Sequence, residues 1–83
     1  MKNQNSAMKN EQEERDRQFQ IEYLTQELIA MLMEDRGMTL EQAMDVVYRS
    51  HTYEKIENAN TGLFYQGPVY VMDMLEEELG GFA

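Results

Sequence analysis

The sequence predicts an all-α fold: a small domain of three to four helices, with a long first helix and a flexible N-terminus. The longest segment that is rich in apolar residues and free of Gly and Pro runs from Phe19 to Met33. Apolar residues recur at helical spacing in two later stretches, and Gly or Pro falls between the stretches, where helices end. A chain of 83 residues is long enough for one domain of modest stability.

The first helix should begin near Glu11, with Asn10 as a candidate N-cap, and should end at Arg36 before Gly37. Residues 1–9 are rich in Asn, Gln and Lys and offer little to bury. We therefore expect a disordered segment over residues 1–9 and a single helical domain over residues 10–83.

Two apolar faces are expected on the first helix at about 100° per residue. One face should pack into the core and consists of Ile21, Leu24, Leu28, Met31 and Leu32. The opposite stripe consists of Phe19, Tyr23, Ala30 and Met33. Two interpretations of the stripe remain open: Phe19, Tyr23 and Met33 bind a partner, or the run Leu63–Tyr65 folds back and covers them as core.

A second helix is expected from Leu40 to about Ser50, antiparallel to the first. Thr39 and Gln42 have the spacing of a capping box. Its apolar residues at helical spacing are Leu40, Ala43, Met44, Val47 and Tyr48. Residues 53–59 predict a short third helix, and the cluster of Asn, Thr and Gly that ends at Gly62 predicts a turn.

The last helix should begin at Pro68, because proline suits the first helical position, and should end at the glycine pair after Leu79. Its expected buried residues are Val69, Met72, Leu75 and Leu79. A hairpin is the alternative, in which residues 69–71 pair with Leu63–Tyr65 and Asp73 caps a shorter helix.

Residues 63–75, LFYQGPVYVMDML, resemble the signature of a small bacterial family of unknown function, L-x-x-Q-G-x-x-Y-[IV]-x-[DE]. The matching residues are Leu63, Gln66, Gly67, Tyr70, Val71, Asp73 and Met74, whereas Phe64, Tyr65 and Pro68 depart from the family's common residues. The resemblance covers roughly residues 22–79. It implies a compact, mostly helical domain. Members are often encoded near ADP-ribosyltransferase-like toxins, which implies an antitoxin-like or accessory binding role.

The net charge of −9 is unevenly distributed. Residues 1–17 balance four basic against four acidic side chains, whereas residues 18–83 hold three basic and twelve acidic ones. Phosphate backbones would be repelled by that region, so we expect no nucleic-acid partner. No apolar run approaches the length of a membrane span, so we expect no membrane partner. The absence of cysteine is compatible with a cytoplasmic location, which we predict.

No pattern of catalytic residues stands out, and we predict a protein that is not an enzyme and binds no cofactor or metal. His51 is the only histidine and lacks an oriented partner in the sequence. Asp73, Glu76 and Glu77 share one helix face, which is typical of a solvated acidic surface.

The predicted function is a non-enzymatic protein–protein interaction module. Its apolar residues on the long helix would bind a protein partner, either a second copy of the chain (a homo-oligomer) or a cognate protein. Two alternatives remain. One is a small ligand-binding or enzymatic domain around His51, Tyr65, Gln66 and Tyr70. The other is an acidic mimic of nucleic acid with two rows of carboxylates.

Overall fold

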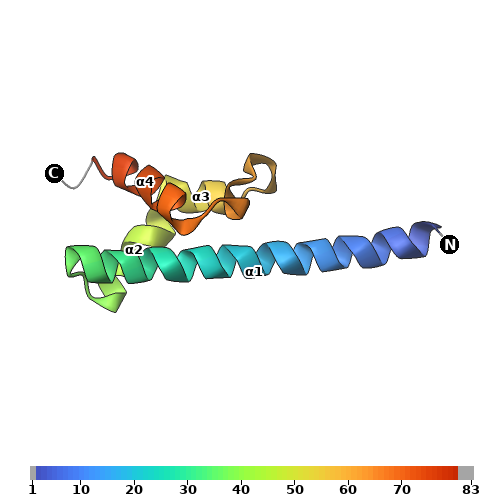
Figure 1. The fold of residues 1–83 in the computed structure, drawn as a ribbon, viewed down its shortest axis with the longest axis horizontal. Coiled ribbons are helices and arrows are strands. Elements are labelled where there is room, and N and C mark those ends of the chain that lie inside the picture. The colour runs from blue at the N-terminus through green and yellow to red at the C-terminus, as the bar shows by residue number, and fades with distance from the viewer. Residues whose placement is uncertain (1, 81–83) are drawn as a thin grey trace.

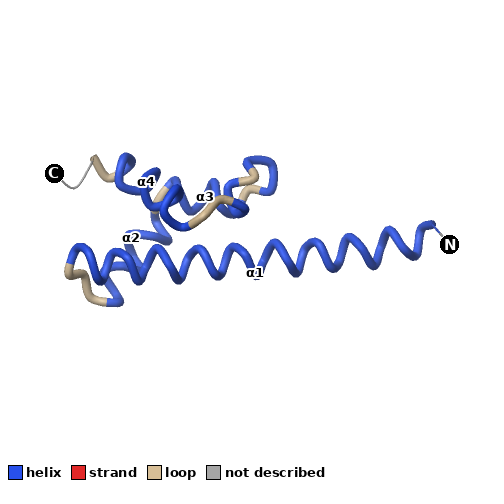
Figure 2. The backbone as a smooth tube through the Cα atoms, viewed as in Figure 1, coloured by secondary structure: helices blue, strands red, loops and turns tan. Residues whose placement is uncertain are grey.

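The computed structural model describes the backbone of residues 2–80 and the side chains of residues 11–80. Within residues 2–80 the chain forms four α-helices and two short 3-10 turns, and no strand (Figure 1, Figure 2). The elements in order are α1 (Lys2–Arg36), α2 (Leu40–Arg49), α3 (His51–Glu57), η1 (Ala59–Thr61), η2 (Leu63–Tyr65) and α4 (Pro68–Glu78). The prediction of an all-α fold with a long first helix is confirmed.

The molecule is elongated, with extents of 56 × 20 × 19 Å. Figure 1 shows α2, α3 and α4 gathered along the C-terminal part of α1, while its N-terminal part runs on without a neighbouring helix. α1 begins at Lys2 and not near Glu11, so Asn10 lies inside the helix and not at its N-cap. No Gly or Pro interrupts residues 2–10. Because Met1 and the side chains of residues 1–10 lie outside the described residues, disorder over residues 1–9 stays a prediction.

The core forms along the predicted face of α1. Ile21, Leu24, Leu28 and Leu32 are buried there, and Ile29 joins them at its edge. Met31, which was expected among them, is only partly buried. The other apolar core residues come from the three shorter helices and η2: Ala43, Val47, Ile56, Leu63, Phe64, Val71, Met72 and Leu75.

α2 begins with the predicted capping box. The Thr39 hydroxyl accepts a hydrogen bond from the Gln42 N–H at 3.1 Å, and the Gln42 side chain accepts one from the Thr39 N–H at 2.9 Å. Figure 1 shows α2 crossing α1 at a steep angle, so the expected antiparallel pair is wrong. The fully buried side chains of α2 are the small Ala43 and Val47, and small residues allow close approach at a crossing.

α3 starts at His51, two residues before the predicted start, because Ser50 caps it. The Ser50 hydroxyl accepts a hydrogen bond from the Tyr53 N–H at 3.0 Å and donates one to the Val47 carbonyl at 2.6 Å. One buried serine therefore ends α2 and begins α3. At the far end of α3, the Arg17 guanidinium donates to the Glu57 carbonyl at 3.0 Å and joins α3 to α1.

α4 has Pro68 in its first turn, as predicted, and the hairpin alternative is wrong because Val69 to Val71 are helical. Its buried residues are Val71, Met72 and Leu75, whereas Val69 and Leu79 are exposed. The helix is therefore rotated relative to the expected orientation, so that Val71 occupies the core position that Val69 was expected to take. Leu79 lies past the last helical residue.

Candidate functional site

Phe19, Tyr23 and Met33 lie on the surface of α1, on the side opposite the core. Their side chains are 68%, 46% and 38% exposed. Leu63 and Phe64 of η2 are themselves buried with the core. They leave the stripe uncovered, so the interpretation of the stripe as core is wrong.

The stripe forms a continuous uncharged line along α1. Five residues that alternate at spacings of four and three form what we call the α1 seam: Phe19, Tyr23, Gln26, Ala30 and Met33. A shallow hollow of about 110 Å³ lies over its N-terminal end, between Phe19, Glu22, Tyr23 and Gln26. Glu22, Glu27 and Glu34 flank the line, and the Tyr23 hydroxyl donates a long hydrogen bond of 3.5 Å to Glu27. The seam is therefore an uncharged, mostly apolar strip with an acidic border.

A second apolar surface lies on α2. Its exposure was not predicted from the sequence. Leu40, Met44 and Tyr48 are 52%, 39% and 48% exposed and follow one another at four-residue spacing. A hollow of about 360 Å³ is lined by Met44 and Tyr48 together with charged neighbours. A signal was present in the sequence: the apolar arc of α2 is too wide for one neighbouring helix to cover.

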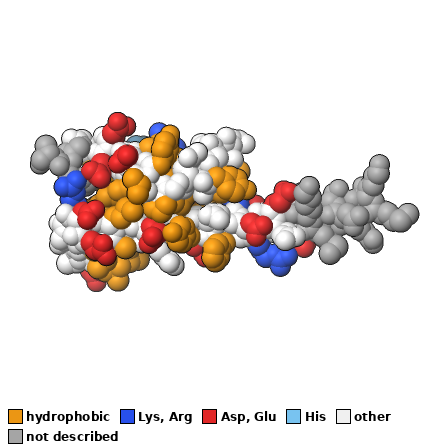
Figure 3. Space-filling model, in the orientation of Figure 1, with side chains coloured by type: hydrophobic (Ala, Val, Ile, Leu, Met, Phe, Trp, Pro, Cys, Tyr) orange, Lys and Arg blue, Asp and Glu red, His pale blue; other side chains and the backbone are white. Residues whose placement is uncertain are grey.

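More hydrophobic surface lies at the corner where η2 leads into α4. Tyr65, Val69 and Tyr70 are all more than half exposed. On the face shown in Figure 3, hydrophobic patches alternate with acidic side chains over the end of the molecule where the four helices meet. The alternative of an acidic mimic of nucleic acid stays a prediction.

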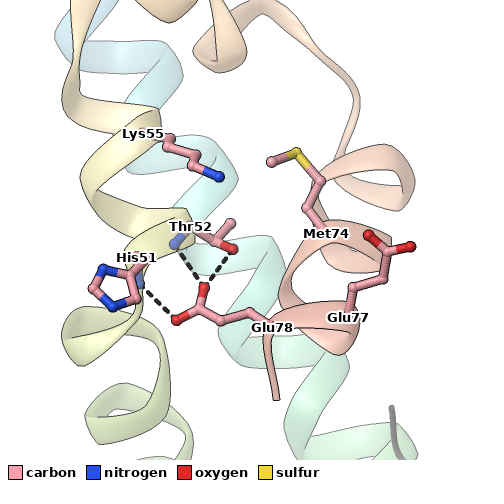
Figure 4. Close-up of a pocket in the computed structure, with 6 residues that line it drawn as sticks. All are labelled: His51, Thr52, Lys55, Met74, Glu77 and Glu78. Carbon is pink, nitrogen blue, oxygen red and sulfur yellow. Dashed lines mark hydrogen bonds between the residues drawn. The ribbon is translucent and has the colours of Figure 1, made fainter. Parts of the chain in front are cut away.

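A hollow of about 550 Å³ lies between α3 and α4 and is lined by His51, Thr52, Lys55, Met74, Glu77 and Glu78 (Figure 4). The Glu78 carboxylate spans it and accepts three hydrogen bonds: from the His51 N–H at 2.7 Å, and from the Thr52 N–H and hydroxyl, each at 2.8 Å. Partial burial acts to raise the pKa of Glu78, but these hydrogen bonds outweigh it and lower the pKa below its ordinary value. The carboxylate thus acts as a structural clasp between two helices.

The structure does not bring His51 together with the other residues of the predicted ligand site. Its imidazole is exposed, points away from the hollow in Figure 4, and lies 2.9 Å from the Glu54 carboxylate through Nδ1. Tyr65 lines a separate hollow beside Arg17, while Gln66 and Tyr70 are exposed on the surface. These four side chains therefore form no common pocket.

The acidic residues of α4 are likewise dispersed. Glu76 forms an ion pair with Arg36 at 3.0 Å, which ties α4 to the end of α1, while Asp73 and Glu77 are exposed. In the described part of the chain, no three His, Cys, Asp or Glu side chains gather closely enough to hold a metal ion. Among residues 2–80, none of the helices combines the length and the apolar character that crossing a membrane requires.

Comparison with protein families, with curated proteins and with solved structures finds no match to this chain. The resemblance in residues 63–75 therefore stays a prediction. In the structure these residues form the η2–α4 corner, where Leu63 is buried, Gly67 is the N-cap of α4 and Tyr70 is exposed.

Proposed function

We propose that this protein is a protein–protein interaction module that binds its partner through the α1 seam. The observation that supports this most directly is the exposure of two aromatic side chains one helical turn apart: Phe19 is 68% exposed and Tyr23 is 46% exposed. Both lie on the side of α1 that faces away from the core. A large aromatic ring buries 150–250 Å² when covered, so adjacent aromatic residues are a strong source of binding free energy.

The composition of the seam fits an interface better than it fits a solvated helix face. Aromatic residues and methionine are enriched at the centres of protein interfaces, where charged residues are depleted. The seam has this composition, with its carboxylates only at the border, at Glu22, Glu27 and Glu34. Such a border disfavours arrangements of the complex that place acidic residues of the partner opposite it.

The partner is a protein, either a second copy of this chain or a cognate protein. The role is antitoxin-like or accessory in the sense that binding, and not chemistry, is the activity. The region from residue 18 onward is strongly acidic, so a nucleic-acid partner is disfavoured. A partner that presents an apolar helix or groove fits the straight shape of the seam.

Tyr23→Glu tests the proposal. Because Tyr23 is exposed, the variant should fold as the wild type does. A charge placed in the apolar seam should weaken binding on the order of 30-fold or more, as loss of an interface anchor does. Static light scattering of the purified chain, together with pull-down of the proteins encoded beside it, measures the assembly.

Tyr70→Glu provides a matched control, since Tyr70 is 56% exposed but lies on α4. It should leave the assembly intact. A chain that is monomeric and retains no partner would refute the proposal, and so would an assembly that Tyr23→Glu and Tyr70→Glu weaken equally.

A further inference from the structure

The spacing of the α1 seam is that of a helix that packs lengthwise against another helix. Its residues follow one another at intervals of four, three, four and three, which is the heptad spacing of a coiled-coil contact line. One more step of four reaches Gly37, immediately after the end of α1. No charged residue falls on the line between Phe19 and Gly37.

We propose that the partner helix is α1 of a second copy of this chain, packed antiparallel along the seam. This inference rests on the proposed function and specifies its partner. In an antiparallel pair the two kinds of heptad core position face each other, so only a few registers are allowed. Of the registers in which every core layer is uncharged, the one with the longest overlap places Tyr23 opposite Met33 of the second copy and Gln26 opposite its Ala30. A shift by one heptad in one direction would place Met33 against the charged Asp16 of the other copy, and a shift in the other direction would leave Phe19 and Tyr23 beyond the end of its α1.

Two of the three distinct layers in this register pair a large side chain with a small one, as close packing requires. The long Gln26 side chain lies over Ala30, and the Tyr23 ring meets the flexible thioether of Met33, a favourable sulfur–aromatic contact. Phe19 lies over Gly37 of the second copy. A side chain built at Gly37 would meet no atom within 4 Å, so the space over this glycine is open to the ring.

The charges at the border of the seam also meet in a defined way. In antiparallel pairs, equivalent border positions face each other across the interface. Glu22 comes opposite Arg36 of the second copy, so that a carboxylate faces a guanidinium. The two copies of Glu27 come opposite each other near the two-fold axis. The contacts between Glu22 and Arg36 thus favour the dimer at both ends of the interface, and the repulsion between the two copies of Glu27 opposes it at the centre.

Paired cysteine variants test the register directly, because the native chain contains no cysteine. Gln26→Cys and Ala30→Cys should form a disulfide-linked heterodimer when mixed at equal concentration and oxidised, since facing core positions lie within disulfide reach. Each variant alone should crosslink several-fold more slowly. Gln26→Cys mixed with Asp45→Cys, an exposed position on α2, controls for random collision. Mass spectrometry distinguishes the products.

Two results would overturn the inference: absence of the mixed disulfide, or crosslinking of each variant alone as fast as the mixture, which indicates parallel helices. Either result leaves the proposed function standing if Tyr23→Glu still abolishes binding of a different protein. The two proposals therefore fail separately.

The repulsion at the two-fold axis gives an independent test. Glu27→Gln should tighten self-association roughly threefold, because it removes two facing like charges. Glu34→Gln removes the same charge but faces the neutral Gln20 of the second copy, so the dissociation constant should change little. Sedimentation equilibrium measures both constants. An equal effect of the two variants, or no effect of either, contradicts the register.

Discussion

At the scale of single residues, the most informative side chain is that of Glu78. Its carboxylate accepts hydrogen bonds from two consecutive backbone N–H groups, those of His51 and Thr52, and from the Thr52 hydroxyl. These amides begin α3 and would otherwise lack partners, because the first N–H groups of a helix have none within it. Glu78 therefore performs for α3, from α4, the role that a capping residue performs locally.

Glu78→Gln should lower the free energy of unfolding by about 1 kcal/mol at pH 7, as loss of a capping carboxylate does. Folding lowers the pKa of Glu78 from its ordinary value of 4.5. Its stabilising contribution is therefore complete above that value and is lost as the pH falls through the lowered pKa. The difference between variant and wild type, measured by urea denaturation at pH 7 and at an acidic pH, should accordingly shrink toward zero as the pH falls through the lowered pKa.

Glu77→Gln is the matched control, since Glu77 is the exposed neighbour of Glu78 and forms none of the clasp's hydrogen bonds. It should change stability by less than about 0.5 kcal/mol at either pH. An equal loss of unfolding free energy in both variants would show that the hydrogen bonds of Glu78 add no stability of their own.

At the scale of elements, two glycines with different backbone conformations lie in the corner before α4. Gly62, between the two 3-10 turns, has φ +66° and ψ +8°, the left-handed region that disfavours residues with a side chain. Gly67, the N-cap of α4, has φ −71° and ψ 160°, which any residue adopts, and forms no side-chain cap. A Cβ at either position would meet no atom within 4 Å, so only the backbone distinguishes them.

The same substitution should therefore have opposite effects at the two positions. Gly62→Ser should destabilise the fold by about 1 kcal/mol through the strain of the left-handed conformation. Gly67→Ser should stabilise it by a few tenths of a kcal/mol, because the serine hydroxyl can cap α4. Thermal and urea unfolding of both variants measure the effects. Changes of the same sign would contradict this account of the corner.

Two element boundaries were predictable from a local signal. The capping box at Thr39 and the helix start at Pro68 depend on residues within one turn, and both were predicted correctly. The orientation of α4 was not predictable, because Val69 and Val71 are chemically equivalent and only packing on α1 decides which one is buried. The crossing of α2 over α1 likewise depends on a contact between distant segments.

At the scale of the whole molecule, the compact part of the fold occupies one end of a long helix. No core residue of the described chain precedes Ile21. In the stretch from Glu11 to Gln20, Arg17 donates a hydrogen bond to the Glu57 carbonyl of α3. The sequence predicted the stripe at Phe19 and Tyr23 but could not decide whether it was core, because that depends on where η2 packs. The exposure of Leu40, Met44 and Tyr48 was not predicted either, because it too depends on how distant segments pack.

This separation predicts that the N-terminal part of α1 can be removed without loss of stability. A chain of residues 16–83 retains Arg17, Ile21 and the whole seam, so its unfolding free energy should match that of the full chain within about 0.5 kcal/mol. Its urea m-value should also match, because m follows the area that unfolding exposes. A chain of residues 23–83 loses both Arg17 and Ile21 and should be less stable by at least about 2 kcal/mol. Equal losses of unfolding free energy in the two truncations would mean that residues before Arg17 belong to the stable fold. If residues 16–83 still form the Gln26–Ala30 mixed disulfide, the whole contact line lies between Phe19 and Gly37.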